Sequence, residues 1–357
     1  MNYGLIDADL LDNGTHHPNL ALMKLSGYLK NKGENVKLIL DYKDIIQFDH
    51  ILISKVFTKT EIPKVVLRRK NISYGGSGFL GEYAPYLIRE IEFHMPDYEL
   101  YNEYVTIEKL NGRKNRRLNE YIDYSIGFTT RGCFRHCDFC INKKYRKVER
   151  HSLVKDFFDP KRKYIYLWDD NFLGYSRWDE VLDELDDIGR PFQFRQGLDI
   201  RLLNEDKAKR LAKSMYHGDF IFAFDFIHER PIIEKKLKLW RSCTNKKTKL
   251  YLLCAYESIQ IDDIINTFER IKVLMEYQCV PYIMRYENYI NSEHKGIYIN
   301  LARWCNQPAI FKKMSFREFC LAHPPTFSTQ KYYFDFINKF PEVSSKYFDM
   351  KFSNFHF

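Results

Sequence analysis

The alternation of strand-like and helix-like patterns between residues 124 and 290 most strongly restricts the fold of this 357-residue chain. Short runs of aromatic and β-branched residues have the composition of buried strands. They lie at 124–130, 164–170, 191–200, 219–227, 249–258 and 280–288. Helical spacing follows at 177–189, 204–215, 231–242 and 261–278. Because strand–helix–strand repeats form parallel sheets with right-handed crossovers, we predict an α/β chain with a partial (β/α)6 barrel of the TIM type.

Polar side chains stand at the ends of these predicted strands. In parallel β/α barrels the chemistry gathers at the C-terminal ends of the strands. The polar residues at these ends are Asp169, Asp170, Asn171, Gln196, Asp199, Arg201, Asp225, Glu257 and Arg285. We therefore expect them to face one common mouth.

The first 100 residues predict a separate and smaller α/β domain. Strand-like runs occur at 3–10, 35–40, 50–57 and 71–79, and a helical pattern occurs at 17–33. This opening predicts a Rossmann-like domain with a parallel sheet. Residues 101–122 are polar and aperiodic, which favours a linker or a surface loop. We expect domains at 1–100 and 123–290, followed by a weakly periodic C-terminal region at 291–357 that caps the barrel.

Three of the eight cysteines, Cys133, Cys137 and Cys140, lie within eight residues, in the loop after the first barrel strand. The polar residues between them make a core role a poor explanation. Structural zinc takes four ligands, and His136 is poorly placed to be the fourth because it adjoins Cys137. A disulfide-exchange pair leaves Cys133 unexplained. A four-iron cluster usually takes four cysteines, so with three of them one iron would keep an open position.

The spacing Cys-x3-Cys-x2-Cys in this loop resembles that of the radical S-adenosylmethionine (radical SAM) superfamily, and Phe139 before the last cysteine fits the family pattern. The resemblance covers residues 124–290. It implies that the three cysteines hold a [4Fe–4S] cluster and that S-adenosylmethionine binds the open iron. It further implies reductive cleavage to a 5′-deoxyadenosyl radical, which abstracts hydrogen from an unidentified substrate. An electron donor such as flavodoxin or ferredoxin is then expected.

The same resemblance suggests which residues contact the cofactor. The stretch WDDNF at 168–172 replaces the family's Gly-Gly-Glu segment and looks like an Asp-Asp variant of it, in which Asp169 or Asp170 accepts from the ammonium group. FRQGLDIR at 194–201 is similar to a segment near the ribose and carboxylate. The structural alternative for the Asp-Asp stretch is helix capping, and for the 194–201 segment it is surface ion pairing. The candidate cofactor-binding residues are Phe139, Asp169, Asp170, Asn171, Gln196, Asp199, Arg201 and Asp225.

The N-terminal domain is similar to the cobalamin-binding domain that precedes many radical SAM barrels. It lacks the Asp-x-His-x-x-Gly pattern, although His16 and His17 lie near the expected place. The glycines Gly75, Gly76 and Gly78 could approach a phosphate or a corrin tail, or form a tight turn. Cobalamin is therefore a possible second cofactor, and a cobalamin-dependent radical SAM methyltransferase is an alternative function.

The formal net charge of +9 is compatible with nucleic-acid binding. A non-catalytic iron–sulfur or zinc protein that binds nucleic acid is the alternative from another class. No signal peptide and no run of 18 apolar residues is visible, so we expect a cytoplasmic protein without a membrane association. An auxiliary cluster is an open alternative for the five other cysteines, although none forms a tight ligand pair. These are Cys243, Cys254, Cys279, Cys305 and Cys320.

Overall fold

The computed structural model describes residues 1–79, 86–142 and 145–355, which form two compact units. The first unit consists of Met1–Thr129, His151–Trp168 and Asp183–Phe192. The second consists of Thr130–Arg150, Asp169–Leu182 and Gln193–Phe357. The units are thus built from interleaved segments, whereas the sequence suggested consecutive ranges.

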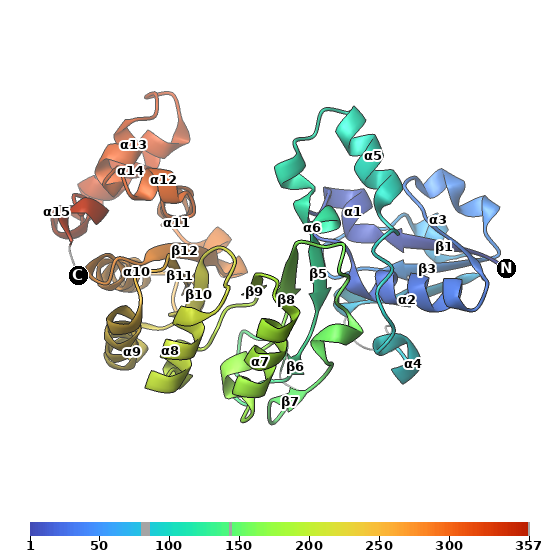
Figure 1. Ribbon diagram of the computed structural model, residues 1–357. Helices are drawn as coiled ribbons and strands as arrows, with labels where there is room; N and C mark the ends of the chain where they lie inside the picture. The colour runs from blue at the N-terminus through green and yellow to red at the C-terminus, as the bar shows by residue number, and fades with distance from the viewer. Residues whose placement is uncertain (80–85, 143–144, 356–357) are drawn as a thin grey trace. The chain divides into compact units, whose positions relative to one another are not determined.

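A four-stranded parallel sheet organises the N-terminal part of the first unit (Figure 1). Its strands are β1 (Asn2–Asp7), β2 (Asn35–Leu38), β3 (His50–Ser54) and β4 (Ile72–Gly75), in the order β2-β1-β3-β4. The helices that follow β1 are α1 (Ala8–Asn13) and α2 (Leu20–Asn31), and two single-turn helices are α3 (Lys64–Leu67) and α4 (Arg89–Glu92). Asn19 caps α2 by accepting from the Leu22 N–H at 3.2 Å. The expected strands and helix of this region are confirmed.

The segment expected as a linker is packed against this sheet. It contains α5 (Asn102–Leu110) and α6 (Asn119–Ile122). Tyr101, Tyr104 and Tyr121 are buried in the same core as Leu5 and Leu22. Residues 101–122 therefore belong to the body of the first unit.

The six strands expected between residues 124 and 290 all form, in two three-stranded sheets. The first sheet has the order β5-β8-β9 and the second has the order β10-β11-β12. Their bounds are β5 (Tyr124–Gly127), β8 (Tyr164–Leu167), β9 (Phe192–Phe194), β10 (Phe220–Ala223), β11 (Thr248–Cys254) and β12 (Val280–Arg285). The helices between them are α7 (Trp178–Ile188), α8 (Glu205–Lys213), α9 (Arg230–Cys243) and α10 (Ile261–Glu276). The chain thus has the mixed α/β class with parallel sheets that the sequence predicts.

Within the second unit, Trp240 of α9 packs on the β10-β11-β12 sheet. The ring of Trp240 lies 4.8 Å from that of Phe220 and 5.5 Å from that of Phe222. Its indole N–H donates to the Thr248 hydroxyl at 2.8 Å. This contact buries the tryptophan and satisfies its single polar atom.

Five α-helices follow β12 in the described part of the chain and belong to the second unit. They are α11 (Lys295–Cys305), α12 (Pro308–Phe311), α13 (Phe316–Leu321), α14 (Ser328–Lys339) and α15 (Pro341–Tyr347). The Asn306 side chain accepts from the Ile283 N–H at 2.7 Å and donates to the Ile283 carbonyl at 3.1 Å. It therefore provides hydrogen-bond partners for one residue at the edge of β12. No helix in the described ranges combines the length and apolar character that a membrane crossing requires.

Candidate functional site

The three clustered cysteines lie in a loop whose two ends are paired. Strand β6 (Thr130–Arg131) runs antiparallel to β7 (Glu149–Arg150) and closes the loop at its base. Gly132 follows directly with a φ of 101°, and a Cβ atom there would lie 2.3 Å from the Lys147 carbonyl oxygen. Only glycine fits this position, because it needs both a positive φ and a close backbone approach.

The two aspartates of the WDDNF stretch hold this loop. Asp169 is buried and accepts from both the N–H and the hydroxyl of Thr130, each at 2.7 Å. Asp170 accepts from the Gly132 N–H at 2.7 Å and from the Asn142 amide at 2.6 Å. Both carboxylates therefore fix the backbone that carries the cysteines, and contact of either with a cofactor ammonium stays a prediction.

Nitrogen donors point at two of the three sulfur atoms. Cys133 Sγ accepts from the Arg135 N–H at 3.4 Å and from the Asn171 side-chain amide at 3.3 Å. Cys140 Sγ accepts from the Asn142 N–H at 3.4 Å. Hydrogen bonds to sulfur favour the thiolate over the thiol, and thiolates are the ligands of iron–sulfur clusters. The donor set thus suits metal-bound sulfur.

Cys137 has a different electrostatic environment. Its partial burial raises the pKa of the thiol, the positive charge of Arg201 opposes this effect, and Asp225 reinforces it. The Cys140 N–H donates to the Cys137 carbonyl at 2.9 Å, which makes a turn between these two ligand candidates. A nearby cation compensates the negative charge that a deprotonated Cys137 would carry.

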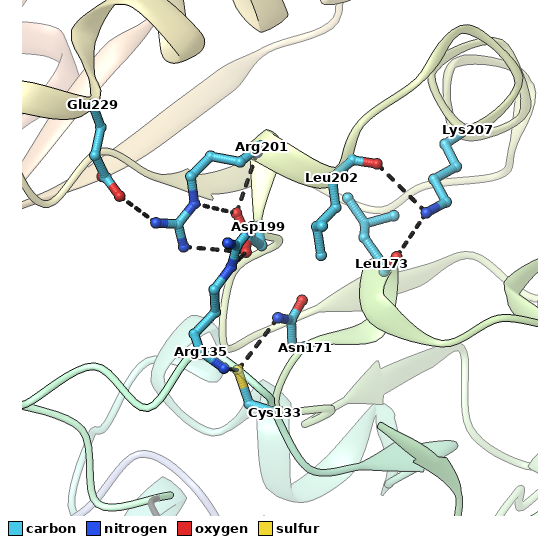
Figure 2. A network of polar contacts seen from close by, with 9 residues as sticks. All are labelled: Cys133, Arg135, Asn171, Leu173, Asp199, Arg201, Leu202, Lys207 and Glu229. Carbon is cyan, nitrogen blue, oxygen red and sulfur yellow. Dashed lines mark hydrogen bonds and ion pairs between the residues drawn. The ribbon is translucent and has the colours of Figure 1, made fainter. Parts of the chain in front are cut away.

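Arg135 of the cysteine loop joins a network of charges at the end of β9 (Figure 2). Its Nε donates to Asp199 Oδ2 at 2.8 Å, and Arg201 Nε donates to Asp199 Oδ1 at 2.7 Å. Arg201 also pairs with Glu229. Burial acts against ionisation of Asp199, but the two guanidinium groups lower the pKa of its carboxyl. The network ties the loop to the end of β9 through ion pairs, which was the structural alternative for Asp199 and Arg201. Contact of either residue with a cofactor stays a prediction.

Asp225, which follows β10, has a carboxyl with a raised pKa. Burial raises its pKa to about 6, the nearby Glu229 adds to the rise, and Arg270 and Arg201 oppose it. Within the second unit it lies close to Arg201 of the network. Asp225 can therefore carry either charge state near neutral pH.

Aromatic rings gather where the same strands end. The Phe139 ring lies 5.9 Å from Phe226 and 5.6 Å from Tyr256, and Tyr256 lies 4.8 Å from Tyr286. Ala255 precedes Tyr256 with a φ of 59°, which is uncommon for alanine. The Ala255 N–H donates to Asp263 at 2.8 Å, and this bond supports the turn. Phe139 thus forms part of an aromatic wall at this end of the unit.

The other candidates are less involved. Gln196 and Glu257 are exposed, and neither side chain has a hydrogen bond to the described residues. Arg285 lies 4.5 Å above the ring of Tyr289. Sequence reasoning missed Arg135 and Asn142, which contact the aspartates. Their position beside the cysteines was the only available signal for them.

Four of the five remaining cysteines have the character of core residues, and Cys243 is partly buried. Cys254, Cys279, Cys305 and Cys320 are buried. Burial raises the pKa of Cys254 to about 12 and that of Cys279 to about 11. Within the described ranges, no three His, Cys, Asp or Glu side chains converge on a point that would hold one metal ion. A four-iron cluster does not require such convergence, because each cysteine binds a different iron atom.

The strand order of the first unit reverses between β1 and β3, and ligands of open α/β sheets bind at the C-terminal ends of the strands at such a point. Here the side chains that follow or precede these strand ends bond to one another. The Tyr101 hydroxyl donates to Asp7 at 2.8 Å, and the Asn19 amide donates to the Ser54 hydroxyl at 2.8 Å. Burial raises the pKa of Asp7 to about 6. This network takes up donors and acceptors that a cofactor tail would otherwise use.

The glycine and histidine candidates of the first unit have structural partners. A Cβ atom on Gly76 would lie 2.2 Å from the Lys55 carbonyl oxygen, so this glycine permits close packing of two chain segments. His17 pairs with Glu120. His16 is exposed. None of these contacts requires a bound cofactor.

Comparison with solved structures shows a likeness in fold to a radical SAM enzyme. The chain is similar in structure to TsrM from Kitasatospora setae, a radical S-adenosylmethionine methyltransferase solved with cobalamin and a [4Fe–4S] cluster. The TM-score is 0.52 at 12% sequence identity, over 80% of this chain and 74% of TsrM. TsrM with tryptophan substrate and aza-SAM, an analogue of S-adenosylmethionine, gives a TM-score of 0.51 at 12% identity, over 79% and 72% of the chains. No protein-family model matches the sequence, and the search among curated proteins finds no match.

Proposed function

We propose that this protein is a radical SAM enzyme whose cluster ligands are Cys133, Cys137 and Cys140. One observation carries the proposal: the loop with these cysteines is closed by β6 and β7, and nitrogen donors point at two of its sulfurs. The similarity in fold to TsrM, which was solved with a [4Fe–4S] cluster, supports the proposal. When bound, a [4Fe–4S] cluster with an open iron supplies one electron for the reductive cleavage of S-adenosylmethionine.

The chain's own residues then have separate tasks. Asp169 and Asp170 hold the loop backbone, and Arg135 and Asp199 tie it to the end of β9. Asn171 is buried, and its Oδ1 atom has no hydrogen-bond partner among the described residues. A buried acceptor without a donor is costly, so we assign this oxygen to the ammonium group of S-adenosylmethionine. We assign Phe139 and its ring neighbours to the exclusion of water from the reaction.

The test is anaerobic reconstitution with iron and sulfide, followed by dithionite and S-adenosylmethionine. We expect 5′-deoxyadenosine as a product, and we expect Cys137→Ala to abolish it. Cys279→Ala is the matched control. This thiol is buried in the turn directly before β12, and it is not part of the cysteine loop. A cluster that forms and yet yields no 5′-deoxyadenosine would contradict the proposal. It would favour a non-catalytic iron–sulfur protein, for which the net charge of +9 suggests nucleic acid as a ligand.

A cobalamin-dependent methyltransferase is the second candidate, because TsrM is a methyltransferase solved with cobalamin. The network of Asp7, Asn19, Ser54 and Tyr101 in the first unit counts against a cobalamin tail at the sheet's switch point. Expression with hydroxocobalamin and the absorption spectrum of the purified protein separate the two. Retained cobalamin would support methyl transfer, and its loss on gel filtration would support chemistry without cobalamin.

The proposed chemistry also requires an electron and a reducing compartment. We propose flavodoxin or ferredoxin as the donor and the cytoplasm as the location, since thiolate ligands persist there. Reduction of the reconstituted cluster by flavodoxin, followed by optical spectroscopy, tests the donor.

A further inference from the structure

A cavity of about 530 Å³ lies at the N-terminal ends of the three strands of the second unit. Asp219, Thr248 and Val280 in its wall stand at or beside the first residues of β10, β11 and β12. The candidate mouth residue Asp225 and the aromatic residues Tyr256 and Tyr286 follow the opposite ends of the same strands. The cavity is therefore separate from the proposed site for S-adenosylmethionine, and its size is typical of small-molecule sites.

A buried arginine forms part of the cavity wall. Arg241 Nε donates to the Tyr277 carbonyl at 2.7 Å, and its other nitrogens donate to the carbonyls of Lys246 and Gln278 at 2.9 and 3.0 Å. These bonds join the loop before β11 to the loop before β12. The guanidinium also donates to the Thr244 carbonyl at 3.3 Å and to the Cys279 sulfur at 3.2 Å. Among the described residues no carboxylate pairs with it, so its positive charge is not neutralised by an acid. Buried charges are usually paired, which makes this cation informative.

Further cations lie in the same wall, and one of them, the Lys246 ammonium, donates to the Ser214 carbonyl at 3.0 Å. Lys246, Lys247 and Lys312 also line the cavity, and Asp219 is the only acid among the lining residues. Asp219 is already 3.3 Å from the Lys249 ammonium, so it compensates little of the excess charge. A concave wall with one sign of charge concentrates ions of the opposite sign. The cavity thus favours an anion that can accept several hydrogen bonds.

The wall also contains a flat apolar surface. Phe352, in the 3-10 helix Phe352–Asn354, lines the cavity, and the Lys312 ammonium lies 5.4 Å from the centre of its ring. Pro308, at the start of α12, lies in the same wall. An aromatic ring beside ammonium groups is suited to a ligand that has a planar ring and a phosphate.

We propose that this cavity binds a phosphate-bearing small molecule of nucleotide size. The phosphate would contact the lysine ammonium groups and would be attracted by the positive charge of Arg241. The planar group would pack against the ring of Phe352. The inference does not depend on the radical SAM proposal, because none of the cluster or mouth residues takes part in it.

Isothermal titration of the full-length protein with adenosine monophosphate tests this assignment, with adenosine and inorganic phosphate as partial ligands. Lys247→Ala combined with Lys312→Ala should weaken binding about tenfold or more, because two charge contacts are lost. Both lysines are exposed, so the double variant should fold. Excess S-adenosylmethionine should leave the binding unchanged, since it is expected at the opposite strand ends.

The matched control is Lys235→Ala combined with Lys331→Ala, which removes the same charge from exposed positions outside the cavity wall. This control should bind as the wild type does. Absence of binding at millimolar nucleotide would overturn the proposal, as would equal weakening in both double variants. Weak nucleotide binding beside tight binding of an RNA oligonucleotide would also overturn it and would assign this face to nucleic acid.

Discussion

The side-chain amide nitrogen of Asn171 lies 3.3 Å from the sulfur of Cys133. Asn171 directly follows Asp169 and Asp170, which hold the backbone of the cysteine loop. One short segment thus fixes the loop and donates to one of its sulfurs. We expect this segment to control both the assembly of a cluster and its electron affinity.

Asn171→Leu should lower the reduction potential of the reconstituted cluster by tens of mV, because a lost hydrogen bond to sulfur destabilises the more negative, reduced form. A redox titration followed by electron paramagnetic resonance measures this shift. Asn288→Leu, at an exposed position, is the control and should leave the potential unchanged. An unaltered potential in Asn171→Leu would mean that the contact does not influence the cluster.

Asp199→Ala should destabilise the protein by roughly 3 kcal/mol, because it removes the shared carboxylate of two guanidinium groups at a site where Asp199 is only 9% exposed. Iron loading should fall in parallel, since Arg135 belongs to the cysteine loop. Denaturation by urea and iron analysis measure the two effects. Glu229→Gln removes a carboxylate that pairs with Arg201 alone, and it should cost about 1 kcal/mol with normal iron loading.

Gly132→Ala should destabilise the cysteine loop by more than about 2 kcal/mol, since the added Cβ atom would collide with the Lys147 carbonyl oxygen. Gly112→Ala is the matched control. Its φ of 79° is also positive, but nothing lies within 4 Å of the added atom, so only the backbone cost of about 1 kcal/mol is expected. Thermal unfolding compares the stability of the two variants. Equal losses of stability would show that the structure relieves the collision at position 132.

Glu92 of the first unit should make stability depend on pH. Burial opposes its ionisation, but the hydrogen bond from His151 and the ammonium of Lys24 lower its pKa to about 2, from an ordinary 4.5. Because the folded pKa is the lower one, the stabilisation is present above pH 4.5 and is lost as the pH falls towards 2.

Glu92→Gln should therefore cost about 1–2 kcal/mol at pH 7, after allowance for the partial exposure of this carboxylate. The difference from wild type should shrink at pH 3.5. Urea denaturation at the two pH values measures this change. A difference that stays constant with pH would show that Glu92 acts through packing instead of charge.

Strands and helices with strong periodicity could be predicted from the sequence. The helical pattern at 261–278 corresponds to α10, and the pattern at 231–242 corresponds to α9. Each helix has an apolar stripe that packs on the sheet, so the spacing of apolar residues along the sequence was enough to predict it. The cysteine loop was also visible, because its ligand candidates are close in sequence.

Contacts between distant segments could not be predicted in the same way. Residues 101–122 appeared aperiodic because their buried residues are mainly tyrosines, which count as polar in a simple pattern. The loop-holding role of Asp169 and Asp170 depends on a backbone about 38 residues away. The partnership of Arg135 with Asp199 spans 64 residues. These contacts are set by tertiary packing.

The most direct test of the central claim is the electron paramagnetic resonance spectrum of the reconstituted, dithionite-reduced protein with and without S-adenosylmethionine. We predict about four iron atoms per chain, a reduced [4Fe–4S] signal that changes when S-adenosylmethionine is added, and loss of the signal in Cys133→Ala, Cys137→Ala and Cys140→Ala. A signal that is insensitive to S-adenosylmethionine, or full iron loading in these variants, would contradict the account.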